Sequence, residues 1–578
     1  MERRKTLKVN IASKIIIGGN SDIAIQSMTN TYNKDVNLTT KQIIEIFEAG
    51  AKLVRLTLPS ASELKYIVQI KNLLQSKGYS NIPLIADIHF SPRIALKAAE
   101  YFDKIRINPG NYAENPRIIN PREFIKRQLT PLVEYLSKTN KALRVGVNHG
   151  SLSKRMLEKY GDTEIGMVES AIEYLSILEE LKFDNVLVSL KATKPRTVIY
   201  ANRMLVNELE KKGKIYPLHL GVTEAGYGID GRIKSAIGIG ILLAEGIGDT
   251  IRVSLTEPPE QEIKPAEIIK NYALNLLKTT KTPPYFLPTT FFKQKTKKVA
   301  NVGGNEKPKV FLLDMENYKM NINDDLLPDF IIKSKGENLV AINTTEKKEY
   351  TVKTKNIQTL DNKEGFLLVP SSDVNFNLMA KLKTCSNLAV IVLLNGENPL
   401  EDQQKFYKLY DKFKLDIPVI YAREYKETCF EEFYIKAAID LGYSFVNGRA
   451  DGIMIINKHF DYNDVLKIAY KILQATGVRV NFTEYIACPS CGRTLFDIEK
   501  TTREIEKYTS QFKGIKIAVM GCIVNGLGEM ADADFGYVGT KPGMISLYHN
   551  KILVKKDLPQ ERAVEELVKL IEKTLAGK

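Results

Sequence analysis

Residues 53–63, LVRLTLPSASE, contain in one stretch the structural unit from which the first half of the chain is built. Arg55 and Thr57 alternate with aliphatic residues, which is the pattern of a β-strand with one apolar face. Ser60 and Glu63 have the spacing of a capping box, which predicts a helix start directly after the strand. The stretch therefore predicts a strand followed closely by a helix.

The same unit recurs along the N-terminal half. A second capping box, Thr39 with Gln42, predicts the start of an earlier helix. Seven further strands are predicted at AIQSMT (24–29), PLIADIH (83–89), KIRIN (104–108), LRVGVNH (143–149), NVLVSL (185–190), PLHLGVT (217–223) and TIRVSL (250–255). Eight strands alternating with helices over about 250 residues are typical of a (β/α)8 barrel. We therefore expect a TIM-type barrel in residues 1–282, with a doubly wound open sheet as the alternative.

The rest of the chain divides into three parts. Residues 283–307 combine prolines, a lysine run and a Gly-Gly pair, which indicates a linker. Residues 308–475 contain six apolar strand candidates and are expected to form an inserted α/β domain, a degenerate half-barrel being one form considered. Residues 476–578 are expected to form a smaller α+β domain, which contains a group of cysteines.

Composition is typical of a globular protein of the cytoplasm with a lysine-rich, solvated surface. The net charge is +15, but lysine is spread along all 578 residues without arginine-rich runs, so we expect no nucleic-acid partner. An anionic substrate would fit this charge. The most hydrophobic stretch, residues 235–248, is too short to span a bilayer, and the first residues do not form a signal peptide. Five cysteines do not make a disulfide framework.

Five predicted strands each carry one cation on the side opposite their aliphatic residues. If the aliphatic side packs on the helices, these cations point to the barrel axis: Arg55, Arg106, Arg144, Lys191 and Arg252. A buried cation is costly without an anion, and Asp87 and Glu224 are too few to balance five charges. A bound diphosphate would balance them. The alternative is a set of internal salt bridges or surface charges.

Polar residues also gather at the carboxyl ends of the strands, where barrel enzymes hold their chemistry. They are Asp87, His89, Asn108, Asn148 and Glu224. Glu224 lies out of phase with Gly221 and Thr223, so strand alternation alone does not aim it inward. His219 lies earlier in its strand and is interpreted as a core histidine with satisfied hydrogen bonds.

The C-terminal cysteines have the spacing of a metal site. ACPSCGR contains Cys488 and Cys491, and GCIVNGLGE contains Cys522 and Glu529. A C-x2-C pair with a distant cysteine suits zinc or an iron–sulfur cluster. Three thiolates and a carboxylate favour a cluster with one weakly held iron, which could bind a substrate oxygen while the cluster supplies electrons.

Other readings of the cysteines stay open. A structural zinc would need a fourth Cys or His, and the nearest downstream candidate is His549. A redox disulfide between Cys488 and Cys491 is a further alternative. Cys385 and Cys429 are interpreted as buried structural cysteines.

Several of these segments together resemble one enzyme family. They are QSMTNT, ADIHF, RINPGN, RVGVNHGSL, LGVTEAG, SAIGIGILLAEGIGDTIRVSLTEPP, ACPSCGR and GCIVNGLGE. In this order they resemble the 4-hydroxy-3-methylbut-2-enyl diphosphate synthases of the methylerythritol phosphate pathway. The likeness covers residues 20–260 and 480–540, and the chain resembles the longer family form with an inserted domain.

The resemblance implies reductive ring opening of 2-C-methyl-D-erythritol 2,4-cyclodiphosphate, with ferredoxin or flavodoxin as electron donor. It implies a [4Fe–4S] cluster held by Cys488, Cys491, Cys522 and Glu529. It implies that the diphosphate is bound by Arg55, Arg106, Arg144, Lys191, Arg252 and Ser254. Glu224 would lie beside the reacting carbons, with Asn148 and Asn525 as polar neighbours.

Two matters stay open after the resemblance. In the short family form the cluster domain of one subunit caps the barrel of its partner, so this chain could act as a monomer or a homodimer. The inserted domain is expected to be a catalytically silent spacer. The rival functions are another barrel enzyme for an anionic substrate with a structural zinc in its tail, and a basic RNA-binding or cluster-carrying protein.

Overall fold

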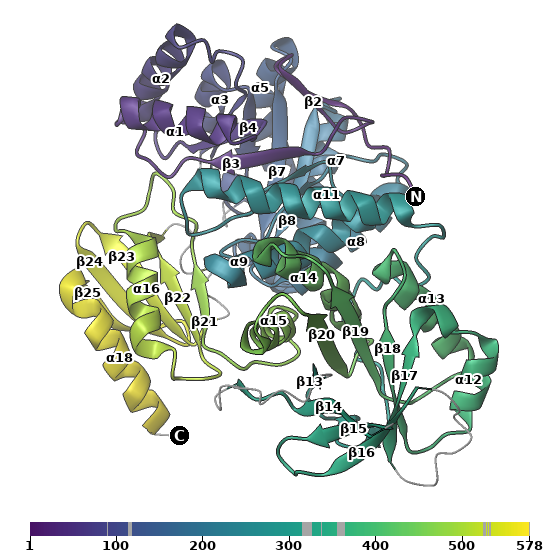
Figure 1. The fold of residues 1–578 in the computed structure, drawn as a ribbon. Coiled ribbons are helices and arrows are strands. Elements are labelled where there is room, and N and C mark those ends of the chain that lie inside the picture. Colours follow the sequence, from purple (N-terminus) through teal and green to yellow (C-terminus); the bar gives the residue numbers. More distant parts are fainter. Residues whose placement is uncertain are drawn as a thin grey trace. The chain divides into compact units, whose positions relative to one another are not determined.

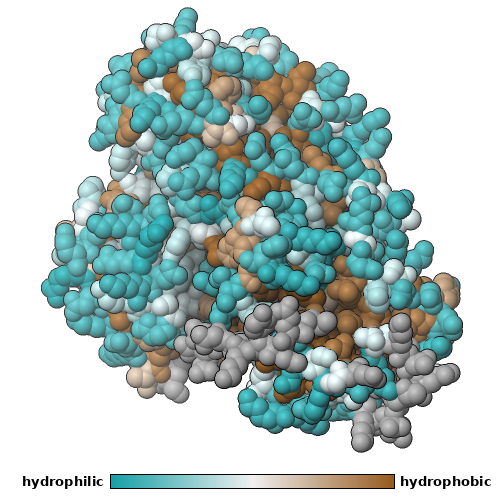
Figure 2. Space-filling view, in the orientation of Figure 1, coloured by the Kyte–Doolittle hydropathy of each residue, from teal (hydrophilic) through white to brown (hydrophobic). Residues whose placement is uncertain are grey.

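The computed structural model describes residues 1–88, 91–113, 118–314, 326–336, 338–354, 364–523, 528, 530 and 533–576. The chain divides into two compact units. One contains residues 3–242, 247–270 and 482–578, and the other contains residues 1–2, 243–246 and 271–481. No helix in the described ranges is long and apolar enough to cross a membrane. The face shown in Figure 2 is mostly hydrophilic.

The first unit contains the predicted N-terminal barrel (Figure 1). All eight predicted strands form: β3 (Ala24–Met28), β4 (Leu53–Thr57), β5 (Leu84–Asp87), β6 (Lys104–Ile107), β7 (Ala142–Asn148), β8 (Val186–Lys191), β9 (His219–Leu220) and β10 (Thr250–Ile251). They pair in parallel in the order β8-β7-β6-β5-β4-β3-β10-β9. A parallel bridge between Val188 and Leu218 joins the two ends. The sheet therefore closes, and the open-sheet alternative is excluded.

Helices alternate with these strands. The longer ones are α1 (Val36–Glu48), α2 (Leu64–Ser76), α3 (Pro92–Tyr101), α5 (Pro121–Lys138), α7 (Glu164–Glu180), α8 (Pro195–Lys211), α9 (Gly228–Ser235) and α11 (Ile263–Thr279). Both predicted capping boxes are wrong. Helix α1 begins before Thr39, whose hydroxyl donates to the carbonyl of Tyr32. Ser60 precedes the 3-10 helix η1 (Ala61–Glu63), and its side chain makes no cap hydrogen bond.

An apolar layer closes the amino-terminal end of this barrel. The antiparallel strands β1 (Val9–Ile11) and β2 (Ile15–Ile17) pack against the first inward side chains of several barrel strands. These side chains are Ala24, Leu53, Ile85, Ala142 and Leu187. Apart from Lys104 at the start of β6, the charged inward residues lie further along the strands, so the polar half of the interior lies toward the carboxyl ends.

The C-terminal domain belongs to the same unit as the barrel. Its sheet has the order β21 (Glu484–Ala487), β22 (Lys516–Met520), β23 (Phe535–Lys541), β24 (Met544–His549) and β25 (Ile552–Pro559). Helices α16 (Ile498–Thr509) and α18 (Gln560–Ala576) share a hydrophobic core with this sheet (Figure 1). Strands β21 and β22 are parallel neighbours, so their carboxyl ends lie side by side.

The second unit contains another closed barrel. Its strands are β13 (Lys309–Asp314), β14 (Phe330–Lys335), β15 (Asn338–Asn343), β16 (Glu349–Lys353), β17 (Gly365–Pro370), β18 (Leu388–Leu393), β19 (Val419–Tyr425) and β20 (Gly452–Asn457). The inserted region is thus a complete barrel, not the half-barrel considered from sequence. Apolar side chains, among them stacked Phe311 and Phe330, fill its core. Strands β11 (Lys298–Val299) and β12 (Val302–Gly303) lie inside the predicted linker.

This second barrel also has helices of its own. They are α12 (Phe376–Lys383), α13 (Pro399–Lys412), α14 (Phe430–Val446) and α15 (Tyr462–Ala475). Strands β14, β15 and β16 are antiparallel neighbours, while the other strand pairs are parallel. The insert is therefore a mixed barrel whose regular α/β part begins at β17.

Candidate active site

One pocket in the first unit is lined by both the barrel and the C-terminal domain. It encloses about 820 Å³ of empty space, part of it open to solvent. The predicted site residues that line it are Arg55, Asp87, Arg106, Arg144, Asn148, Lys191, Glu224, Arg252, Ser254, Cys488, Cys491 and Cys522. The five strand cations and the three thiols, which the sequence separates by hundreds of residues, therefore face one space.

Glycines make room for two of the cations. A Cβ atom on Gly146 in β7 would lie 2.5 Å from Nε of Arg106. A Cβ atom on Gly221, just after β9, would lie 2.5 Å from Nζ of Lys191. Real side chains do not approach this closely, so any larger residue at either position would displace a cation.

Two of the five cations are paired with carboxylates. Nη1 of Arg106 lies 3.0 Å from Oδ1 of Asp87. Arg252 makes a bidentate ion pair with Glu262: Nη2 donates to Oε1 at 3.0 Å and Nε donates to Oε2 at 3.2 Å. Glu262 ends the 3-10 helix η3 (Pro259–Glu262), and sequence reasoning missed it. It lies outside every strand, so no alternation pattern could have found it.

The other three cations have no carboxylate partner within the ranges that the structure describes. The guanidinium of Arg55 donates only to the weakly accepting sulfur of Met28, at 2.9 and 3.1 Å. Nε and Nη1 of Arg144 are buried without a hydrogen-bond partner. Burial lowers the pKa of Arg55 to about 10, with Arg252 and Arg106 adding to the effect and Asp87 opposing it. Burial and then neighbouring arginines lower the pKa of both Arg144 and Lys191. The pocket is thus prepared for an anion.

A polar layer lies beneath these cations in the barrel interior. Nζ of Lys104, both amide atoms of Gln26 and Nε2 of His219 are buried without partners among the described residues. His219 contacts Thr250 through Nδ1 at 3.3 Å. The interpretation of His219 as a fully satisfied core residue is therefore wrong. Lys104 shares the inward phase of Arg106, so the same alternation could have identified it.

Glu224 reaches the pocket through an unusual backbone. Strand β9 ends at Leu220, and Glu224 has a φ of +50°, in the left-handed region. Strand alternation no longer applies there, which is why Thr223 and Glu224 both line the pocket despite being sequence neighbours. A non-glycine residue in this conformation is strained, and such strain concentrates at functional sites.

The remaining predicted residues divide into two groups. Asn108 is not among the residues that line the pocket; its side chain instead caps α4 (Pro109–Tyr112) by accepting from the amide of Gly110 at 3.1 Å. His89, Asn525 and Glu529 lie outside the described residues.

The cysteines follow the carboxyl ends of two adjacent strands. Cys488 and Cys491 follow β21, and Cys522 follows β22. The amide of Gly521 donates to the sulfur of Cys488 at 3.3 Å, which brings the two loops together. None of the three is in a disulfide. Of the two other cysteines, Cys429 is exposed and Cys385 is only partly buried, so the prediction that both are buried is wrong.

The donor set of this pocket fits a cluster better than a single ion. Within the described ranges, no three Cys, His, Asp or Glu side chains converge closely enough to hold one metal ion. An iron–sulfur cluster is larger, and its thiolates lie around its periphery. Three cysteine side chains facing one space, with an amide hydrogen bond to one sulfur, match that requirement.

Close backbone contacts join the C-terminal domain to the barrel. A Cβ atom on Gly150 would lie 2.4 Å from the carbonyl oxygen of Gly528. A Cβ atom on Gly492 would lie 2.9 Å from the carbonyl oxygen of Thr31. Thr256 also donates to the carbonyl of Ala487 at 3.3 Å. These glycines therefore allow the loops that carry the cysteine motifs to approach the barrel rim.

A partly buried carboxylate strengthens the same contact. Glu484 at the start of β21 lies 2.8 Å from Nζ of Lys234 in the barrel and 3.2 Å from Nζ of Lys516. Although burial raises it, Lys234 and Lys516 lower the pKa of Glu484 to about 2. The ion pair is therefore retained at any physiological pH.

We expect Glu484→Gln to destabilise this unit by about 3 kcal/mol at neutral pH, because it leaves Lys234 buried without its counter-charge. The pKa is depressed from 4.5, so the stabilisation is present above that pH and is lost as the pH falls toward 2. Urea unfolding of both proteins from about pH 7 to about pH 3 measures the difference, which should narrow below about pH 4.5. The control Glu499→Gln removes an exposed pair with Arg503 and should cost under about 0.5 kcal/mol.

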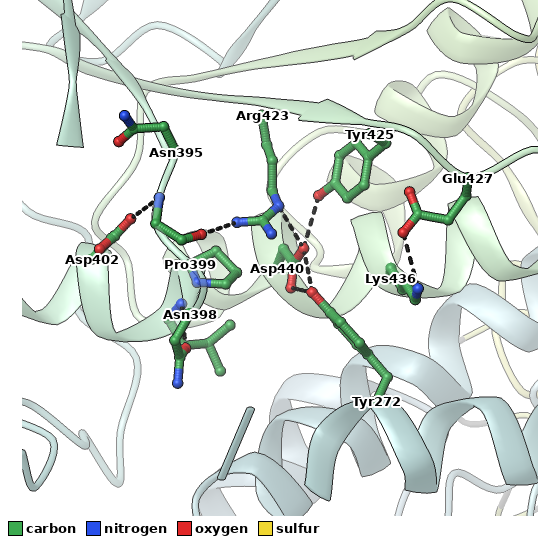
Figure 3. A network of polar contacts seen from close by, with 12 residues as sticks. Tyr272, Asn395, Asn398, Pro399, Asp402, Arg423, Tyr425, Glu427, Lys436 and Asp440 are labelled. Carbon is green, nitrogen blue, oxygen red and sulfur yellow. Dashed lines mark hydrogen bonds and ion pairs between the residues drawn. The ribbon is translucent and has the colours of Figure 1, made fainter. Parts of the chain in front are cut away.

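The second unit contains an ionisable network that sequence reasoning missed (Figure 3). Asp440 of α14 is fully buried and lies 3.2 Å from Nε of Arg423. Tyr272 donates to both its oxygens at 2.8 and 2.9 Å, and Tyr425 donates at 3.1 Å. Burial raises the pKa of Asp440 to about 6, against the opposing effect of Arg423. One cation and two hydroxyl groups satisfy this carboxylate. The network therefore holds Tyr272 of α11 against β19 and α14.

Comparisons with known proteins agree with this arrangement. The model of the GcpE TIM-barrel domain matches residues 6–267, and that of the GcpE protein C-terminal domain matches residues 484–573. The 4-hydroxy-3-methylbut-2-en-1-yl diphosphate synthase (flavodoxin) of Phocaeicola vulgatus is 40% identical over 98% of this chain and 97% of its own. Proteins of the same name from Chlamydia pneumoniae and Leptospira interrogans are 38% and 37% identical, each over 99% of this chain and 96% of their own. The likeness therefore runs through the inserted barrel.

Proposed function

This chain belongs to the family of 4-hydroxy-3-methylbut-2-en-1-yl diphosphate synthases, and from that premise we propose how its pocket carries out the family's reaction. It is an iron–sulfur oxidoreductase of isoprenoid biosynthesis, in the methylerythritol phosphate pathway. Its substrate is 2-C-methyl-D-erythritol 2,4-cyclodiphosphate, and its product is (E)-4-hydroxy-3-methylbut-2-enyl diphosphate. Two electrons and two protons enter, the ring C–O bond breaks, and one oxygen leaves as water. One observation supports this assignment most: three cations without carboxylate partners among the described residues and three cysteine side chains face the same pocket.

We assign the diphosphate to the cationic side of the pocket. Arg55, Arg144 and Lys191 lack carboxylates, so bound phosphate oxygens would supply the missing counter-charge. Arg106 and Arg252 are already held by Asp87 and Glu262 and would present their remaining donors from fixed positions. Ser254 and Asn148 line the same wall and would accept or donate further hydrogen bonds.

Glu224 is assigned as the residue that moves a proton. Glu224 is 6% exposed and lines the pocket with the thiols. Its side chain enters the pocket because the backbone of Glu224 has a left-handed conformation. From there it would donate a proton to the leaving oxygen, which departs as water. His89 and Asn525 remain proposed polar neighbours of the substrate, from sequence alone.

The thiols are assigned to one [4Fe–4S] cluster per chain. Cys488, Cys491 and Cys522 would hold it, with Glu529 as the proposed fourth ligand. When bound, the cluster supplies the two electrons and an iron that can act as a Lewis acid. Flavodoxin, named in the relatives, is the proposed electron donor, and ferredoxin is the alternative. The family assignment leaves no support for a structural zinc in another type of barrel enzyme.

One chain is proposed to contain a complete active site. The thiols and the barrel cations line one pocket of a single polypeptide, so a monomer would suffice and a homodimer would hold two independent sites. We place the enzyme in the cytoplasm, where its small diphosphate substrate and flavodoxin would both be present.

The function is tested on anaerobically purified protein. About four irons and matching acid-labile sulfide per chain are expected. With the cyclodiphosphate and a chemical reductant, the protein should form hydroxymethylbutenyl diphosphate, and omission of the reductant should stop turnover. Protein with a full iron complement that consumes no cyclodiphosphate would contradict the assignment.

The inserted barrel is proposed to be a silent spacer. Its interior is filled by apolar side chains, and its buried Asp440 is fully satisfied. We expect Tyr272→Phe to lower the stability of this unit by about 1–2 kcal/mol, because Asp440 loses a donor, and to leave turnover unchanged. Urea unfolding and steady-state assays measure the two effects. A large loss of turnover with the fold intact would mean that the insert contributes to catalysis.

A further inference from the structure

The pocket contains a cation that comes from the C-terminal domain, not from the barrel. Arg493 follows Cys491 in the loop after β21 and lines the pocket together with Arg55, Arg144 and Lys191. It is partly buried. It therefore brings a further positive charge into the pocket from a different domain.

Arg493 has little to hold it in the protein itself. Nη2 of Arg493 donates a long hydrogen bond, 3.5 Å, to the carbonyl oxygen of Asp87 at the end of β5. In the part of the chain that the structure describes, no carboxylate lies within ion-pair distance of it. The pocket that Arg493 lines already contains Arg55, Arg144 and Lys191 and is strongly positive.

The backbone next to Arg493 explains why it points there. Gly492 lies against the barrel so closely that a Cβ atom would be 2.9 Å from both the carbonyl oxygen of Thr31 and the hydroxyl of Thr57. The following side chain therefore starts at the rim of the barrel. A loop with a larger residue at position 492 could not approach this far.

Like charges on two facing domains repel unless an anion lies between them. We propose that Arg493 is a substrate-binding residue that contacts the diphosphate from the cluster-bearing domain. This proposal rests on the function assigned above. One phosphate group held by both Arg144 and Arg493 converts repulsion between the domains into attraction, so substrate binding and docking of the thiol-bearing loops reinforce each other.

The test uses anaerobically purified holoprotein and inorganic pyrophosphate as the probe, measured by calorimetry. We expect Arg493→Gln to weaken pyrophosphate binding about 10- to 100-fold, as for loss of a charge-assisted contact. Arg493→Lys should recover part of this loss, because the charge is kept. Hydrogen exchange supplies a second readout: pyrophosphate should slow exchange in residues 489–494 of the wild type, but much less in Arg493→Gln at saturating probe.

Arg562→Gln is the matched control, since it removes an exposed arginine from α18 of the same domain and should leave both readouts unchanged. Wild-type affinity and wild-type protection in Arg493→Gln would overturn the proposal. A parallel measurement on Arg144→Met distinguishes the role of Arg493 from the existence of the anion site. If Arg144→Met loses pyrophosphate and Arg493→Gln does not, only the role of Arg493 fails; if neither loses it, the anion site itself is wrong.

Discussion

Cys522→Ser should abolish turnover while leaving the barrel able to bind the cyclodiphosphate. The cysteine follows β22 and faces the pocket with Cys488 and Cys491. A serine hydroxyl is a harder and far less acidic donor than a thiol, so it holds iron of a sulfide cluster poorly. We expect a fall in turnover of more than about a thousandfold and a clear loss of iron and acid-labile sulfide.

Affinity for the cyclodiphosphate should change little, because five of the cations that would hold it come from the barrel and the substitution leaves Arg493 in place. Cys429→Ser is the matched control: this cysteine is exposed at the start of α14 and should tolerate the change. Anaerobic iron analysis, a reductant-driven assay and calorimetric titration supply the three measurements. Turnover that survives the loss of iron would remove the redox mechanism.

Alternation of inward and outward side chains predicted most of the pocket's cations, because the strands that carry them are long enough to keep this alternation regular. Strands β4, β6, β7 and β8 each contain four to seven residues, and their cations point inward as expected. Alternation still holds one residue after the two-residue strand β10, where Arg252 lines the pocket, but it fails four residues after β9. Strand β9 has two residues, and Glu224 enters the pocket through a backbone conformation that no local pattern of the sequence indicates.

Residues brought in by tertiary structure were not predictable in the same way. Glu262 neutralises Arg252 from a 3-10 helix that follows the last barrel strand. Arg493 was passed over because its role depends on where the C-terminal domain meets the barrel. The capping box of Thr39 and Gln42 failed for a related reason. The side chain of Gln42 makes hydrogen bonds to Asn30 in a neighbouring loop, so it is not available to cap the helix.

The inserted barrel shows a different limit of sequence reasoning. Strands β16 and β20 were not predicted, and without them the region resembled half a barrel. EYTVK in β16 is short and half polar, and GIMIIN in β20 is a short apolar run that could equally belong to a helix. The buried network around Asp440 was missed because its members come from α11, β19 and α14, and no motif joins them.

Arg144→Met should weaken substrate binding and at the same time stabilise the substrate-free protein. Arg144 is 1% exposed, faces Arg55 and Arg106, and has two nitrogen atoms without hydrogen-bond partners. Its charge is therefore a cost to the fold when no anion is bound. Methionine fills a similar volume without that charge, so we expect a gain of about 1–3 kcal/mol in the free energy of unfolding.

The same substitution removes a donor from the proposed phosphate site. We expect affinity for the cyclodiphosphate or for pyrophosphate to fall by about 2–3 kcal/mol, roughly a hundredfold. Urea unfolding of the substrate-free protein and calorimetric titration measure the two effects. A variant that is less stable than the wild type would mean that Arg144 is held by a partner in the fold and is not kept for the substrate.

Arg106→Met provides the comparison that isolates this cause. Arg106 lies beside Arg144 in register on the neighbouring strand but is paired with Asp87 at 3.0 Å. Removing it leaves a buried carboxylate without its partner, which should cost about 3–5 kcal/mol of stability. Two arginines of one barrel layer should thus change stability in opposite directions under the same substitution. A gain in stability for Arg144→Met beside a loss for Arg106→Met is expected if the charge of Arg144 is balanced by a bound anion and not by a carboxylate of the protein.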